Sequence, residues 1–133
     1  MKVSMIEYDS MLYAILVRNE SCPDGSHFIT DGSGLLEVGF LSHKKGARLT
    51  EHFHLPFRRE TNGTNEVLFL KSGAVRCFFY GLDHSQKGSV DLMEGDLILL
   101  IDGGHGFEML EDSVLIEVKN GPYAGLKDKM RFN

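Results

Sequence analysis

The stretch 66-EVLFLKSGAVRCFFYG-81 is typical of two short β-strands that are joined by a tight turn. Both halves are rich in strand-forming residues, and Lys71-Ser72-Gly73 between them supplies turn chemistry. Similar segments recur along the chain between further glycine-containing turns. They are 11-MLYAILV-17, 34-GLLEVGFLS-42, 47-ARLTEHFHL-55, 95-GDLILLI-101 and 113-SVLIEVK-119. Because no helical stripe interrupts them, the sequence predicts an all-β sandwich or barrel.

Length and composition set the broad class of the protein. The 133 residues fit a single domain, 1–133, with a hydrophobic core of its own. A net charge of −5 and the absence of long basic runs argue against nucleic-acid binding and against anionic membranes. Cys22 and Cys77 have neither metal-type nor redox-motif spacing, so we expect reduced cysteines, with a lone disulfide as the alternative. These features, and the lack of any apolar run of membrane-spanning length, predict a cytoplasmic protein.

Two histidines, His52 and His54, lie at alternate positions of the segment 47–55. If this segment is a strand, both imidazoles leave the backbone on the same face, together with Arg48. That face is too polar for a core, and the wet interior of a barrel would explain it. The alternative is a pair of exposed strand histidines.

Two further residues complete a candidate metal site. Glu66 opens the strand 66–70, and His105 follows the strand 95–101 within a glycine-rich segment. Three imidazoles and one carboxylate suit a divalent first-row metal such as Fe, Mn, Ni, Co or Zn. Glu66 could instead be a strand-edge carboxylate, and His105 a turn histidine.

The spacing of these residues resembles a known family. Gly46, His52-x-His54, Glu66 and Gly73 look like the first motif of the cupin superfamily, and Gly95 with Gly104-His105 looks like the second. These motifs cover residues 46–73 and 95–106. The ending 115-LIEVKNGPYAGLKDK-129 is similar to that of small single-domain cupin metalloproteins of the WbuC type, which are associated with bacterial surface-polysaccharide gene clusters.

The resemblance implies a double-stranded β-helix, or jelly-roll barrel, with one metal held inside by His52, His54, Glu66 and His105. It also implies a homodimer. The chain departs from the family pattern by an inserted segment of eleven residues, 55–65, between His54 and Glu66. We expect the tail 121–133 to pack on the barrel or on a partner.

Other residues are candidates for contact with a substrate. Glu117 and Lys119 share one face of the strand 113–119 and would form an acid–base pair if that face looks inward, or ordinary surface residues if it looks outward. Tyr80 is a third catalytic candidate, although alternation alone does not say which face of its strand is inside. Arg48 and Arg58 would bind an anionic group of the substrate. Arg58, with Arg59, could equally belong to a solvated loop.

Two functions follow from this site. The first is a metal-dependent enzyme, of the isomerase, epimerase or oxygenase type, acting on a small polar molecule such as a sugar or sugar derivative. The second is a non-catalytic module that binds or senses a metal or a saccharide, because one fold supports many functions. Neither hypothesis involves a nucleic acid or a membrane.

Overall fold

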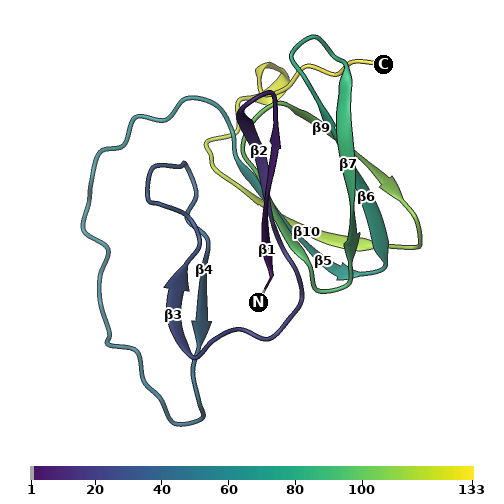
Figure 1. Cartoon of the computed structure of the whole chain (residues 1–133). Helices are drawn as coiled ribbons and strands as arrows, with labels where there is room; N and C mark the ends of the chain where they lie inside the picture. The colour runs from purple at the N-terminus through teal and green to yellow at the C-terminus, as the bar shows by residue number, and fades with distance from the viewer. Residues whose placement is uncertain (1) are drawn as a thin grey trace.

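The computed structural model describes residues 2–133, and these residues form β-strands and one short 3-10 helix (Figure 1). The strands are β1 (Val3–Tyr8), β2 (Met11–Val17), β3 (Gly25–Phe28), β4 (Gly39–Ser42), β5 (Glu66–Ser72), β6 (Ala74–Tyr80), β7 (Gln86–Met93), β8 (Leu97–Leu100), β9 (Gly104–Met109) and β10 (Val114–Lys119). The helix η1 spans Gly125–Lys127. The prediction of an all-β protein is confirmed. No helix within residues 2–133 has the length and apolar character needed to cross a membrane.

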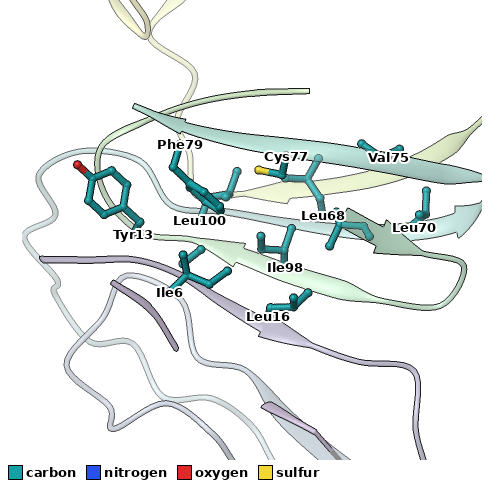
Figure 2. Packing of buried hydrophobic residues seen from close by; sticks show 12 residues of the cluster. Ile6, Tyr13, Leu16, Leu68, Leu70, Val75, Cys77, Phe79, Ile98 and Leu100 are labelled. Atoms are coloured by element: carbon teal, nitrogen blue, oxygen red, sulfur yellow. The ribbon is translucent and has the colours of Figure 1, made fainter. Parts of the chain in front are cut away.

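The strands form three antiparallel sheets. Five strands pair in the order β1-β2-β8-β5-β10, three pair in the order β7-β6-β9, and β3 and β4 form a separate hairpin. The two larger sheets face one another, and their apolar side chains meet between them (Figure 2). The two sheets form an open sandwich, because β9 and β10 are each the last strand of their sheet; this two-sheet body is called the barrel from here on.

The core lies between these two sheets and is almost completely buried. Its largest fully buried side chains include Tyr13, Leu70, Phe79 and Ile98, and Figure 2 shows Phe79 beside Tyr13. Each large apolar side chain stabilises the folded state by roughly 1.5–3 kcal/mol when it is fully buried. The inward-facing apolar residues of both sheets, on β2, β5, β6 and β8 above all, therefore stabilise the fold.

The turn between β5 and β6 requires glycine. Gly73 has a φ of 93°, which is the left-handed region that L side chains rarely adopt. A Cβ atom at this position would lie 2.3 Å from the Ser113 hydroxyl oxygen and 2.5 Å from the Asp112 carbonyl oxygen. The turn accordingly packs directly against the segment that leads into β10.

A buried carboxylate organises the neighbouring turn, between β7 and β8, which lies beside the end of β5. Asp96 is only 2% exposed, and it accepts hydrogen bonds from the Arg18 guanidinium at 2.7 Å and from the backbone N–H groups of Asn19 and Met93 at 2.8 and 2.9 Å. These contacts join the end of β2 to the turn between β7 and β8. A buried charge is tolerated because its oxygens are paired in this way.

The outer face of the five-stranded sheet is also apolar. The strand register places two rows of apolar side chains across all five strands, on the side opposite the core. The rows are Val3, Val17, Leu97, Phe69, Ile116 and Met5, Ile15, Leu99, Val67, Val118. Residues 29–36 lie against the β1, β2 and β8 part of this face. Phe69, Ile116 and Val118 at the other end remain 37%, 48% and 56% exposed.

The segment 47–55 is not a strand, which corrects the sequence prediction. All of residues 43–63, called the arm from here on, are exposed, and no strand lies within them. Figure 1 shows the arm as a wide loop beside the β3–β4 hairpin and away from the barrel. Alternation of side chains is present in 47–55, but no neighbouring strand supplies the hydrogen bonds that a β-strand needs. The predicted strand 34–42 is likewise reduced to β4.

The C-terminal tail returns to the barrel. The ring of Phe132 stacks on His84, with ring centroids 4.4 Å apart, and meets the edge of Tyr80 at 5.2 Å. A Cβ atom on Gly104 would lie 3.2 Å from Phe132, so the backbone of β9 passes close to this ring. The tail therefore borders the open side of the barrel.

Candidate functional site

Glu66 and His105 meet at the open side of the barrel. Glu66 is the first residue of β5, and His105 is the second residue of β9. A carboxylate oxygen of Glu66 lies 3.2 Å from Nε2 of His105, and the two side chains are 12% and 31% exposed. The structure thus brings together two of the four predicted metal ligands, from two different sheets.

The position of Glu66 is determined by its neighbour, Asn65. The Asn65 side-chain amide donates a hydrogen bond to the Ile101 carbonyl at 2.9 Å, and its backbone N–H donates to Oδ1 of Asn120 at 2.8 Å. Asn120 also donates to the Gly63 carbonyl at 3.2 Å. This Asn65–Asn120 clamp holds the start of β5 in place where the arm ends.

The surroundings of Glu66 favour its ionised form. The hydrogen bond from His105 holds the pKa of the Glu66 carboxyl below its ordinary value of 4.5, against the opposing effect of burial. The charges of His105, Lys119 and Lys129 lower this pKa further. At neutral pH, Glu66 is therefore a carboxylate at the edge of a cationic environment.

A hollow of about 800 Å³ lies beside the pair. Its walls come from β6, β9, β10 and the C-terminal tail, and they mix aromatic, charged and hydroxyl groups. They include Phe78, Tyr80, Phe107, Glu117, Lys129 and Phe132. A second hollow, of about 150 Å³, lies next to Asp102 and Asp128 and shares Glu66, Gly103, His105 and Lys129 with the first. The pair is therefore accessible from two directions.

The three predicted catalytic residues all lie near this site. Tyr80 and Glu117 line the larger hollow. The Lys119 ammonium lies 3.8 Å from an Asp128 carboxylate oxygen and 5.6 Å from the centre of the Tyr123 ring. Glu117 and Lys119 share the inward face of β10, because they alternate with the outward-facing Ile116 and Val118.

His52 and His54 are not part of this site. They lie in the exposed arm, with their ring centroids 5.2 Å apart, and Nδ1 of His52 lies 2.9 Å from the Thr50 carbonyl oxygen. Within residues 2–133, no group of three or more His, Cys, Asp or Glu side chains is placed to hold a metal ion. Glu66 and His105 alone are too few, since protein metal sites of this type use at least three protein ligands. The predicted four-ligand set therefore does not converge within one chain in this arrangement.

The predicted substrate-binding arginines also lie in the arm. Arg48 pairs with Glu51, and Arg58 pairs with Glu60 at 3.0 Å. All four side chains are largely exposed. Neither arginine lines the hollow beside Glu66.

The C-terminal tail supplies residues that the sequence analysis did not assign to the site. Lys129 lines both hollows, and Arg131 and Phe132 line the larger one. The only signal for them was the tail's mixture of cationic and single aromatic residues after the last strand.

The two cysteines are free, and burial raises the pKa of the Cys77 thiol to about 12.

Comparison of the chain with protein-family models, with curated proteins and with solved structures finds no match in any of the three.

Proposed function

We propose that the hollow beside Glu66 and His105 binds a small polar molecule, and that these two side chains are two of the four ligands of a divalent transition metal. The observation that carries the proposal is the 3.2 Å approach of a carboxylate and an imidazole from two different sheets. Both groups are ligands that first-row metals accept. A metal at this point would polarise a carbonyl or hydroxyl group of the bound molecule, or lower the pKa of a bound water.

The walls of the hollow suit a sugar or a sugar derivative. Phe78, Phe107 and Phe132 offer apolar rings, while Lys129 and Arg131 offer positive charge for an anionic substituent. Tyr80 and Glu117 are the candidates for moving a proton on the bound molecule, since both line the same space. This arrangement supports an isomerase, epimerase or oxygenase.

The cupin-like spacing of His52, His54, Glu66 and His105 supports the same proposal, together with a double-stranded β-helix as the complete fold. The antiparallel β5–β8 and β6–β9 pairs, with Glu66 and His105 at their ends, are compatible with half of such a site. The other half lies in the arm.

The test is metal binding by the intact protein, with Co²⁺ as the probe. Wild-type protein should bind about one Co²⁺ per chain, and Glu66→Gln or His105→Asn should weaken binding by at least about tenfold. His27→Asn and Glu111→Gln change exposed groups of the same types outside the arm and the site and should leave binding unchanged. Equal Co²⁺ affinity in Glu66→Gln, His105→Asn and the two controls would contradict the proposal.

A metal-free acid–base site is the second candidate. The direct contact between Glu66 and His105 favours it, because a carboxylate that holds an imidazole in one orientation is a common arrangement for proton transfer. A thermal-shift screen of neutral and acidic sugars, run before and after chelator treatment, separates the two. Ligand binding that survives chelation supports the metal-free site, and binding that is lost supports the metal centre. A non-catalytic module would bind the same ligands without converting them. There would then be no reaction rate for Tyr80→Phe or Glu117→Gln to change.

A further inference from the structure

Two sheet edges remain open on the side of the barrel that carries the site. β9 ends the three-stranded sheet and β10 ends the five-stranded sheet, and both contribute walls to the larger hollow. The outer backbone groups of an edge strand have no partner in the sheet and readily pair with another extended segment. The barrel is therefore open where one or two further strands would fit.

The arm has the properties of the missing strand. Residues 47–55 alternate as a strand would, with Leu49, Phe53 and Leu55 on one side and His52 and His54 on the other. Phe53, Leu55 and Phe57 are 94%, 82% and 72% exposed. Large apolar side chains that are concentrated in one segment and fully in water mark a surface that binds a partner.

The total surface of the chain points the same way. The accessible surface is 9617 Å², whereas a compact monomer of 14.9 kDa would expose about 7,000 Å². The excess of about 2,600 Å² per chain is in the range that tightly associated subunits bury at their interfaces. Part of this excess belongs to the exposed arm, and pairing of the arm with another chain would remove it from water.

Both ends of the arm are attached to its own barrel. The Asn65–Asn120 clamp holds one end through the Gly63 carbonyl. The other end continues from the β3–β4 hairpin, and residues 29–36 before β4 lie against the outer face of β1, β2 and β8. Between these attachments the arm projects away from the barrel (Figure 1).

We propose that the arm of each chain pairs with the open edges of a second copy, and that it brings His52 and His54 to the Glu66 and His105 of that copy. The metal part of this statement rests on the proposed function, whereas the exchange of arms does not. In a two-fold symmetric dimer both chains pair in this way at once, because each chain supplies one arm and one pair of open sheet edges.

Association with a second copy also accounts for an exposed apolar surface. An arm folded onto its own barrel would leave this surface uncovered. Phe69, Ile116 and Val118 form an apolar patch on the outer face of the five-stranded sheet, beyond the part that residues 29–36 cover. If the arm instead lined the hollow of its own chain, this patch would stay exposed to water. In a pair of chains, the partner covers the patch and its arm closes the barrel.

The first experiment measures association without any metal. Sedimentation velocity of chelator-treated wild-type protein should show a dimer, and the double variant Phe53→Asp/Leu55→Asp should weaken dimerisation by about a hundredfold or more. Leu82→Asp introduces the same charge at another exposed leucine, in the turn after β6, and should leave the dimer intact. Circular dichroism checks that each variant remains folded. A wild-type monomer at every soluble concentration, or an unchanged dimer in the arm variant, would overturn the exchange.

The second experiment asks which chain supplies the histidines. One chain carries His52→Asn/His54→Asn and the other carries Glu66→Gln/His105→Asn, each with its own affinity tag, and the two are co-expressed. Neither chain alone should bind Co²⁺ tightly. The doubly purified mixed dimer should bind one Co²⁺, because one barrel with intact Glu66 and His105 receives an arm with intact histidines.

The outcomes separate the two proposals. A mixed dimer without Co²⁺, beside a wild-type dimer that binds it, shows that each arm closes its own barrel and overturns the exchange. Wild-type protein that binds no Co²⁺ overturns the metal centre, and sedimentation of the arm variant then decides the exchange by itself.

Discussion

The barrel and the arm are built from similar sequences but differ completely in their surroundings. In the barrel, the apolar residues of β5 and β6 alternate between two faces, and the inner ones are almost entirely buried. In the arm, Leu49, Phe53 and Leu55 alternate in the same way and are all exposed. The difference is a neighbouring strand, which β5 and β6 have and the arm lacks. An alternating pattern decides which side chains share a face, whereas hydrogen-bonded neighbours decide whether the segment becomes a strand.

The sharpest test of this contrast replaces one phenylalanine in each region. Phe79→Ala, in the core, should lower the free energy of unfolding by about 3–5 kcal/mol, because it leaves a cavity among packed side chains. Phe57→Ala, in the arm, should change it by no more than about 0.5 kcal/mol. Urea unfolding at concentrations where the protein is a single chain measures both. Equal losses would show that the arm is packed in the isolated chain.

A charged group of the barrel provides the second comparison. Asp96→Ala should lower the free energy of unfolding by about 3 kcal/mol, since it leaves two backbone N–H groups without their acceptor and removes the carboxylate that pairs with the Arg18 guanidinium. Glu94→Ala removes an exposed carboxylate from the same turn and serves as the control, with a change of no more than about 0.5 kcal/mol. Similar denaturation midpoints for the two variants would contradict the role assigned to Asp96.

The third prediction uses pH to compare a buried thiol with an accessible one. The Cys77 pKa is raised by burial from 9.0 to about 12, so the folded chain keeps this proton above pH 9 while the unfolded chain loses it. The stabilisation of the folded state that comes from the protonated Cys77 thiol is fully present below pH 9 and is lost as the pH rises toward 12. At pH 10 the loss amounts to about 1.4 kcal/mol.

Cys77→Ala is the reference for this measurement. Its unfolding free energy should fall less between pH 8 and pH 10 than that of the wild type, by the amount just given. At pH 8, iodoacetamide should modify Cys22 in the folded protein well before Cys77, because Cys22 is partly exposed and Cys77 is buried. Rapid modification of both thiols would show that the core opens easily.

The smallest expected effect concerns the site itself. The carboxyl of Glu66 should titrate below 4.5, and its pKa should rise in His105→Asn, because the hydrogen bond from His105 is the largest cause of the lowered value. Glu66 therefore contributes stability above pH 4.5 that is lost as the pH falls through its lowered pKa. Carbon-detected NMR titration of the side-chain carboxyl measures the shift, with Glu60 in the arm as an exposed reference. An unchanged Glu66 pKa in His105→Asn would contradict the pairing.

The sequence predicted the all-β class and most of the central strands because their apolar residues alternate strongly. It missed β7 and β9, whose segments 86–93 and 104–109 are polar or rich in glycine. These strands exist because both edges of β6 supply hydrogen bonds to them, and propensity does not contain that information. β1 and β3 were missed as well.

The candidate site, like the fold, was predictable only in part. Glu66 and His105 were chosen by their position at strand ends, and the register of β5 and β9 brings them together. Lys129 and Phe132 reach the hollow only because the chain turns back after β10, which no periodic pattern signals. His52 and His54 lie beside each other as alternation implies, but the location of the whole arm depends on what it pairs with.

The Asn65–Asn120 clamp has a mechanical consequence. It lies between the arm and Glu66, and it attaches the chain to the barrel at the residue just before the carboxylate. A displacement of the arm therefore meets the clamp at Gly63 and Asn65 before it reaches Glu66. We expect the distance between the Glu66 carboxylate and the His105 imidazole to depend little on where the arm lies.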